Sequence, residues 1–443
     1  MTKKHLGLRP TGAPQYKVAK LLAYVIGGIV VLLPFHALLT TWLGSNTGHL
    51  DLVRIWKEIL IVGMIPFVTW LILGNQELKD WFLHSSLIWL IRAYILLHLI
   101  LGAWALASHQ LNATALIYAL IINLRFLIFF IVCYATAAYS DFLRLHWRWL
   151  LLGPAAIVIA FGLIQLALPT DFLRHFGYGP KTIPAFQTVD SDLNYQRIQS
   201  TLRGANPFGA YLVLIIPAFI ICLRSFWRVA ALIASSAALV YTYSRSAWLG
   251  VIAAIASLED FRSRFSRKTK ELIAIALAIV VLIGLGAYAL RFNHTAQDAL
   301  FHTSSQSVNV SSNSRRASAI KDGLIDVTLQ PLGRGPGTAG PASFRNTGHM
   351  ARIAENYYLQ IGQEVGILGM FLFIAINILV AKDLWLKRQY LLPQLLLASL
   401  VGITLVNLVS HAWADDTLSL LWWGLAGIAL APVYKLPGKR VVK

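Results

Sequence analysis

The chain has 443 residues, of which 57% are hydrophobic and only 13% are charged, and its mean hydropathy is +0.64. This composition is typical of a polytopic membrane protein and excludes a soluble core of this length. The net charge of +19 is spread over short segments between apolar runs, a distribution that argues against nucleic acid as a partner.

Apolar runs of about 17 to 25 residues recur along the chain, and each is long enough to cross the hydrocarbon core of a bilayer as a helix. We therefore expect an all-α, polytopic bundle of about twelve transmembrane helices, forming a single integral membrane domain over residues 1–443. The predicted spans begin near Val18, Trp56, Ser86, Thr114, Trp149, Pro207, Val229, Ser246, Leu272, Asn356, Leu391 and Thr417.

The distribution of lysine and arginine predicts the orientation of these spans. With a cytoplasmic N-terminus, the inner segments collect the basic residues of positions 3–20, 144–148, 224–228, 262–270, 382–388 and 435–443. An even number of spans places both termini in the cytoplasm, and both are basic. We expect a multi-pass protein of the bacterial cytoplasmic (inner) membrane whose basic segments contact anionic membrane lipids.

Arg125 interrupts the apolar run of the fourth predicted span. A charge at this depth must face the protein interior or a water-filled cavity. The sequence leaves two interpretations open, a structural ion pair and a cavity-lining residue.

A first polar segment, residues 169–206, is predicted to be an outer loop that ends in Arg197, Arg203 and Asn206, followed by Pro207. Pro207 suits the first turn of the next helix, with Asn206 as its N-cap. Arg203 then lies near free backbone N–H groups, and this combination predicts an anion site. Anchoring to lipid phosphate is the alternative for both arginines.

Arg245 lies in the next outer turn, where two predicted spans meet with almost no linker. This arginine is expected at or slightly below the outer interface. Because a charge there is costly unless it is paired, the position favours a functional role over phosphate anchoring.

The second outer loop, residues 291–355, is the long polar segment between the ninth and tenth spans. Arg315 to Ile325, which includes Arg316, has the apolar spacing of a short surface helix. Pro331 to Thr338, which includes Arg334, is rich in glycine and is predicted to form either a backbone nest for an anion or a plain turn.

The same loop closes with His349, Arg352, Glu355 and Asn356. Arg352 and Glu355 are three residues apart, so we expect them on one helical face, with the arginine keeping the carboxylate ionised. Glu355 is a candidate general base, helix capping being its alternative role, and His349 is a second possible base.

Asp415 and Asp416 occupy the last outer turn. Adjacent carboxylates can bind a divalent metal, but two of them are a weak signal. The sequence favours helix capping by one of the pair.

Taken in order, these segments resemble the O-antigen ligase and O-antigen polymerase superfamily from about Arg197 to the C-terminus. The resemblance rests on residues 197–209, 244–250, 315–322, 331–337 and 356–368. It implies an all-α membrane protein with a long outer loop over the active site. It also implies metal-independent, inverting transfer from an undecaprenyl-diphosphate-linked glycan to a glycan or glycolipid acceptor, with no cofactor.

By motif position, the resemblance implies that Arg203 and Arg245 hold the donor diphosphate, with Arg197 and Arg352 as further candidates. The ligases carry a histidine followed by Asn, Ser or Gln, then nine residues and a glycine. Asn356 and Gly366 fit that pattern, but Glu355 occupies the histidine position. This departure favours a polymerase or an atypical transferase, with Glu355 as the base and with mobility around residues 333–340 admitting the acceptor.

Two other functions stay open at this stage. A lipid-linked oligosaccharide flippase or transporter would also contain many spans and an intramembrane arginine, but it is expected to have inverted repeats or broken helices, and the sequence indicates neither. A metal-dependent transferase would use Asp415 and Asp416. The glycan, its linkage, the acceptor and the oligomeric state are not encoded in any recognisable pattern.

Overall fold

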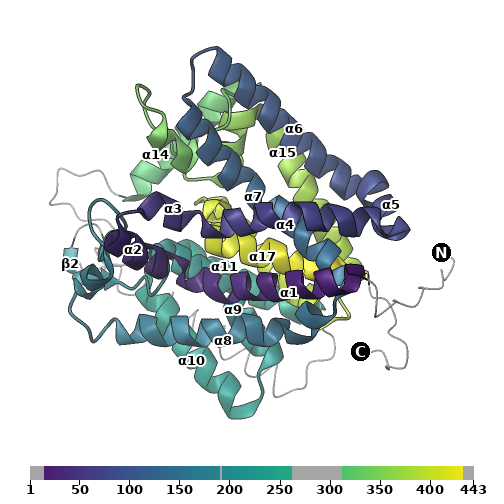
Figure 1. Ribbon diagram of the computed structural model, residues 1–443. Helices are drawn as coiled ribbons and strands as arrows, with labels where there is room; N and C mark the ends of the chain where they lie inside the picture. The colour runs from purple at the N-terminus through teal and green to yellow at the C-terminus, as the bar shows by residue number, and fades with distance from the viewer. Residues whose placement is uncertain (1–13, 190–191, 262–311, 433–443) are drawn as a thin grey trace.

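A computed structural model describes residues 14–189, 192–261 and 312–432. Figure 1 shows a bundle in which α1, α4, α17, α11, α9 and α8 run in one general direction, while α6 and α15 cross it obliquely. The first half consists of α1 (Pro14–Leu32), η1 (Leu33–Phe35), α2 (His36–Thr47), α3 (Leu50–Arg54), α4 (Trp56–Leu73), α5 (Gln76–His84), α6 (Ser86–Ala107), α7 (Ala113–Tyr139) and α8 (Phe142–Ile164). The second half consists of η2 (Phe172–Phe176), β1 (Gln187–Val189), β2 (Asp192–Arg197), α9 (Ala205–Cys222), α10 (Ser225–Tyr241), α11 (Arg245–Phe261), α14 (Ser312–Leu329), η4 (Gly340–Arg345), α15 (Tyr357–Leu386), α16 (Leu391–Asn407), η5 (Ala412–Ala414) and α17 (Asp416–Leu430).

The helices confirm an all-α membrane protein. Within the described residues, seven helical stretches are long and apolar enough to cross a bilayer, and four shorter apolar helices accompany them, namely α10, residues 245–258 of α11, α16 and α17. The predicted span near Leu272 lies outside the described residues. A total of about twelve spans therefore stays a prediction. The strand content of the described residues is one antiparallel hairpin, β1–β2.

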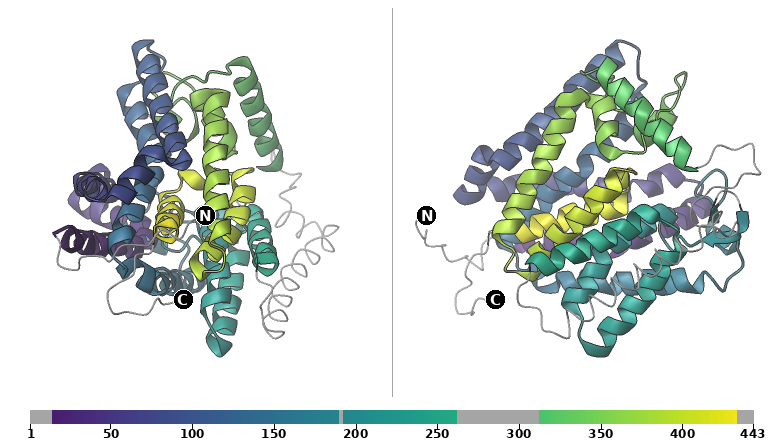
Figure 2. Two further views of the ribbon diagram at one scale, coloured as in Figure 1. Left: turned by 90° about the vertical axis from the view of Figure 1, so that its right-hand side faces the viewer. Right: turned by 180° about the vertical axis from the view of Figure 1, so that it is seen from behind.

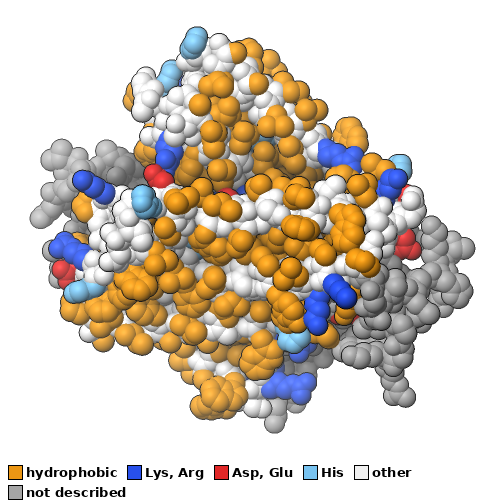
Figure 3. Space-filling view, viewed as in Figure 1, with side chains coloured by type: hydrophobic (Ala, Val, Ile, Leu, Met, Phe, Trp, Pro, Cys, Tyr) orange, Lys and Arg blue, Asp and Glu red, His pale blue; other side chains and the backbone are white. Residues whose placement is uncertain are grey.

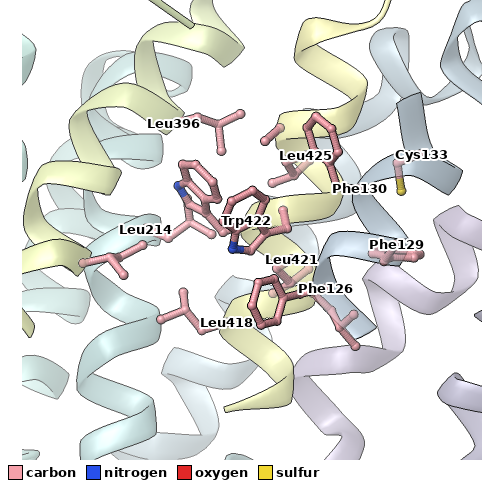
Figure 4. Close-up of a cluster of buried hydrophobic side chains, with 14 of the residues drawn as sticks. Phe126, Phe129, Phe130, Cys133, Leu214, Leu396, Leu418, Leu421, Trp422 and Leu425 are labelled. Atoms are coloured by element: carbon pink, nitrogen blue, oxygen red, sulfur yellow. The ribbon is translucent and has the colours of Figure 1, made fainter. Parts of the chain in front are cut away.

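Aromatic side chains fill the centre of the bundle, where α17 packs against α7. Trp422 and Trp423 of α17 are fully buried, and the ring of Trp423 lies 5.4 Å from that of Phe126. Figure 4 shows this cluster, in which leucines of α9 and α16 close around Trp422 opposite the phenylalanines of α7. In a membrane, such packing rather than water exclusion holds helices together.

The two ends of the bundle differ in structure. We call one the loop end: it is formed by α3, the β1–β2 hairpin, η4 and residues 408–415 (Figure 1). At the opposite end α1 begins and α17 ends, and Arg144 and Lys387 donate to the carbonyls of Pro432 and Leu430. Both polar segments predicted as outer loops therefore contribute to one end, opposite the predicted cytoplasmic turns.

One helix departs from regular geometry. In α15, Val365 and Gly366 have non-helical backbone angles, with φ +74° at Gly366, so the helix is broken at this point. Because of the break, the carbonyls of Gln363 and Glu364 accept hydrogen bonds from outside the helix, from the N–H groups of Arg334 and Gly335. The sequence indicated no broken helix, and that expectation is wrong. A glycine can leave the helical conformation at little cost, and the neighbouring loop satisfies the backbone carbonyls that the break frees.

The start of α9 also corrects an expectation. The helix begins at Ala205 with Gly204 as its N-cap, so Asn206 is not the cap. Instead, the side-chain oxygen of Asn206 accepts a hydrogen bond from Arg197. The predicted surface helix lies within α14, which runs alongside the first part of α15 (Figure 2).

Helices α11 and α16 cross at a pair of glycines, and we expect a side chain there to destabilise the bundle. A Cβ on Gly402 would lie 2.2 Å from the carbonyl oxygen of Gly250. Gly402→Ala should therefore lower the free energy of unfolding by about 1–3 kcal/mol, measured as a lower thermal unfolding temperature in detergent. Gly153→Ala, whose Cβ meets nothing within 4 Å, is the matched control and should be neutral. Equal unfolding temperatures for the two variants would contradict this packing.

Candidate functional site

A cavity of about 570 Å³ opens at the loop end, between α3–α4 on one side and α7 with the start of α17 on the other. The surface around it is mostly apolar, and acidic and basic side chains gather where α3 and α4 meet the helices above them (Figure 3). Five cationic and three anionic residues line the cavity: Arg54, Lys57, Arg125, Arg203 and Arg345, and Asp51, Glu58 and Asp416.

The floor of this cavity is a network of buried ion pairs from α2, α4, α7 and α17. Lys57 Nζ lies 2.9 Å from Asp416 Oδ2 and 3.2 Å from Glu58 Oε2, and Arg125 Nη1 lies 2.9 Å from Glu58 Oε1. His36 Nε2 is 3.0 Å from the same oxygen of Asp416. Arg125 is thus both an ion-pair partner and a cavity-lining residue, the two roles between which the sequence could not decide.

Arg203 reaches the cavity from a loop that buried polar contacts hold in place. The Gln165 side-chain oxygen accepts from the N–H groups of Gln199 and Ser200, at 3.2 and 2.9 Å. The hydroxyls of Ser200 and Thr201 donate to backbone carbonyls of α8 and η1. Because these groups are buried and bonded, the backbone before Arg203 is fixed, while its own side chain is accessible.

The rim of the cavity carries Arg54 of α3 and Arg345 of η4. Both approach Asp51 Oδ1, at 3.7 and 3.9 Å, and the guanidinium of Arg345 lies 4.4 Å from the ring centre of Tyr118. Burial and, after it, the charge of Arg203 lower the pKa of Arg54. The three arginines therefore lie close enough for their charges to interact.

Arg197 and Arg245, two further predicted diphosphate ligands, do not line this cavity. Arg197 Nε donates to the carbonyl of Thr242 at 2.8 Å, and its Nη2 donates to Asn206. Its guanidinium thus joins the start of α9 to the turn before α11. Arg245 is the first residue of α11 and is not among the residues that line the cavity. Its pairing with Arg203 stays a prediction.

Glu355 lies just before α15 in a left-handed backbone conformation, with φ +50°. Such strain in a residue other than glycine is uncommon outside functional sites and turns. Its Oε2 is 3.9 Å from Arg316 Nε of α14. Asn356, rather than Glu355, caps α15: its side chain accepts from Leu359 N–H and donates to the carbonyl of Leu408.

His411, in the turn before η5, lies close to this carboxylate. Burial lowers the pKa of His411, the charge of Glu355 opposes that effect, and the charges of Arg203 and Arg316 add to it. His411 is therefore close enough to Arg203 and to Glu355 for their charges to act on it.

Arg352 has a different partner from the one expected. Its Nε lies 3.9 Å from Asp326 Oδ2, and Arg334 Nη2 lies 2.9 Å from Asp326 Oδ1. The pairing of Arg352 with Glu355 is wrong because the residues before α15 are not helical, so a separation of three residues does not place them on one face. His349 is exposed in the turn after η4.

The glycine-rich segment binds a carboxyl group that belongs to the protein itself. The N–H of Gly337 donates to Glu364 Oε1 at 2.8 Å, and Asn123 donates to Glu364 Oε2 at 2.6 Å. Gly333, Gly335 and Gly337 all have positive φ and are buried. The glycine-rich segment thus binds a side-chain carboxyl group of α15, and the expected mobility around residues 333–340 does not fit a buried, bonded segment.

Asp415 and Asp416 have separate structural partners. Asp415 caps α17 by accepting from Leu418 N–H at 3.1 Å, as the sequence favoured. Asp416 belongs to the ion network of the cavity floor. Among the described residues, no group of three or more His, Cys, Asp or Glu side chains could hold a metal ion.

Sequence reasoning missed Arg54, Lys57, Glu58 and Arg345 as cavity residues. Lys57 and Glu58 stood at the expected start of a span, where charges are ordinary. A signal was nevertheless present, since an adjacent lysine and glutamate could neutralise one another if the helix began deeper in the protein. Arg345 was one of several basic residues in a long loop and carried no local signal.

Residues 230–374 match the family model described as O-antigen ligase. The matched stretch runs from α10 into α15 and includes Arg245, Arg316 and Glu355. It confirms the resemblance to the O-antigen ligase and polymerase superfamily and indicates a multi-pass membrane glycosyltransferase of the O-antigen ligase type. A search of curated proteins gave no match.

We expect the carboxylate of Glu364 to stabilise the segment that leads to Arg345. Glu364→Leu leaves the buried N–H of Gly337 without an acceptor and should cost about 1–3 kcal/mol, seen as a lower unfolding temperature in detergent. Glu364→Gln keeps an acceptor oxygen for Gly337, and the Asn123 amide can turn over so that its Oδ1 accepts from the new amide, so the effect should be small. A Gln variant as unstable as the Leu variant would contradict the hydrogen-bond explanation.

Proposed function

We propose that the protein is a metal-independent, inverting glycosyltransferase that moves a glycan from an undecaprenyl diphosphate carrier to an acceptor hydroxyl. The reaction would take place at the loop end, on the outer face of the cytoplasmic membrane. The observation that carries this proposal is Arg203, which lines a cavity with two more cationic than anionic residues and lies beside the turn next to Glu355.

The donor would bind with its diphosphate in the cavity and its prenyl chain along the apolar surface of the bundle. Guanidinium groups form short, often bidentate hydrogen bonds to phosphate oxygens. They act most strongly on the leaving diphosphate, because negative charge increases there as the bond to the sugar breaks. Arg203 supplies one such group, and Arg245 is proposed as the second from the family resemblance.

Glu355 would act as the general base. The acceptor oxygen attacks the anomeric carbon from the side opposite the diphosphate, the carbon–oxygen bond to the diphosphate breaks, and the hydroxyl proton passes to the carboxylate. Displacement from the opposite side inverts the anomeric configuration. Arg316 Nε lies 3.9 Å from the carboxylate and would hold it in place before the reaction.

Removing the donor-binding arginines should abolish transfer. We expect Arg203→Ala and Arg245→Ala each to lower the rate by about 100- to 1000-fold, since each removes a donor to the leaving group. The rate is measured in membranes with a lipid-linked glycan donor, at equal protein levels. Arg174→Ala, an exposed arginine of η2, is the matched control and should be fully active. Near-normal transfer by both site variants would reject the proposed donor site.

The candidate base is tested by two substitutions at one position. Glu355→Gln should lower the turnover by about 100-fold or more, with donor binding unchanged, because the amide cannot accept a proton. Glu355→His should retain a measurable part of the activity, since the related ligases carry histidine at this position. An inactive His variant together with an active Gln variant would exclude proton abstraction by this residue.

Polymerase and ligase share this donor chemistry and differ in the molecule that supplies the hydroxyl. Deletion of the gene separates them. Loss of chain length with single repeats still attached indicates a polymerase, whereas accumulation of long polymer on its lipid carrier indicates a ligase.

The broken helix α15 is a feature that a flippase would also have. Here the loop of residues 334–335 satisfies the carbonyls freed by the break, so they are not available to a transported ion. Transport of a labelled lipid-linked sugar in liposomes without an acceptor would nevertheless distinguish a flippase from a transferase.

A further inference from the structure

Arg54 and Arg345 have no role in the donor site described so far, although both line the same cavity as Arg203. They come from α3 in the N-terminal part of the chain and from η4 after the glycine-rich segment. The family match begins at residue 230, so it does not cover Arg54, and nothing in the sequence pattern singled out either residue.

The cations on the floor of the cavity are neutralised by carboxylates, whereas the arginines nearer the rim are not. Glu58 and Asp416 neutralise Lys57 and Arg125 at distances of 2.9 to 3.2 Å. The remaining lining charges are three arginines and a single carboxylate, Asp51. The side chain of Asp51 is 83% exposed and is 3.7 Å or more from both rim guanidiniums, so it balances them weakly.

Tyr118 of α7 fixes the arrangement of these cations. The guanidinium of Arg345 lies over its ring at 4.4 Å, and its hydroxyl is a partner of Arg203. A cation over an aromatic face is held in orientation without losing its hydrogen-bond donors. The donors of Arg345 thus stay available to a ligand in the cavity.

We propose that Arg54, Arg203 and Arg345 together form a three-arginine site for the diphosphate of the lipid-linked donor, with Asp51 as a counterion that the ligand displaces. This inference rests on the proposed function and extends it to two residues and a competing carboxylate. A diphosphate carries the multiple negative charge that three guanidiniums require, and its oxygens can accept bidentate hydrogen bonds from several of them.

The site has a consequence for the order of events. Arg345 belongs to the segment that follows the loop held by Glu364, whereas Arg54 belongs to α3 and Arg203 to the loop before α9. A diphosphate bound between them joins these parts of the protein. Donor binding should therefore stabilise the position of η4 against the bundle before the acceptor arrives.

The test is binding of farnesyl diphosphate, a soluble prenyl diphosphate, to the purified full-length protein in detergent. Arg54→Ala and Arg345→Ala should each weaken binding by about tenfold to a hundredfold. Asp51→Asn should strengthen it several-fold, because the competing anion is gone. Arg174→Ala should leave it unchanged, and ligand-free unfolding temperatures show that each variant is folded.

The outcomes distinguish this inference from the proposed function. If the wild type binds the ligand and Arg203→Ala weakens binding, but the two rim variants bind as the wild type does, the three-arginine site is wrong and the donor site stands. If the wild type does not bind farnesyl diphosphate, both are wrong. If phosphatidylglycerol displaces the ligand at equal concentration, the rim is a lipid-headgroup site and the inference is also overturned.

Discussion

The site depends on one constraint, the pairing of charges that are buried among membrane-spanning helices. Lys57 and Asp416 lie in α4 and α17, and Glu58 and Arg125 lie in α4 and α7, so two ion pairs fix three helices around the cavity. Each charge would be strongly destabilising if its partner were absent. The network therefore sets the relative depth of these helices and leaves the cations nearer the rim available for a ligand.

A second set of buried polar contacts places the working side chains around that floor. Gln165 and the hydroxyls of Ser200 and Thr201 hold the loop that ends in Arg203. Asn356 caps α15 and binds the carbonyl of Leu408, which keeps Glu355 beside the turn of His411. Arg203 and Glu355 thus come from loops, and their positions are set by bonds to helices.

The sequence predicted the fold class and the helices well, because apolar runs of span length are dictated by the bilayer and are local in the chain. It also indicated Arg203 and Arg125, since charges beside or inside apolar runs are costly and stand out. It could not find Arg345 or Arg54, because their role arises from contacts between segments far apart in the chain. The error in pairing Arg352 with Glu355 has a local cause: helical spacing was assumed for residues that precede the helix.

Glu364 illustrates a further limit of sequence reasoning. It lies within an apolar helix and had no assigned role, yet its carboxyl group is what the glycine-rich segment binds. The glycines were recognised as able to bind an anion, but a pattern cannot distinguish a substrate from a side chain of the same protein. Only the fold brings residues 337 and 364 together.

The break in α15 has a mechanical consequence. Since the carbonyls of Gln363 and Glu364 are bonded to residues 334 and 335, separating that segment from the helix would expose unpaired polar groups in an apolar setting. The glycine-rich stretch and the first half of α15 are therefore expected to behave as a single rigid element.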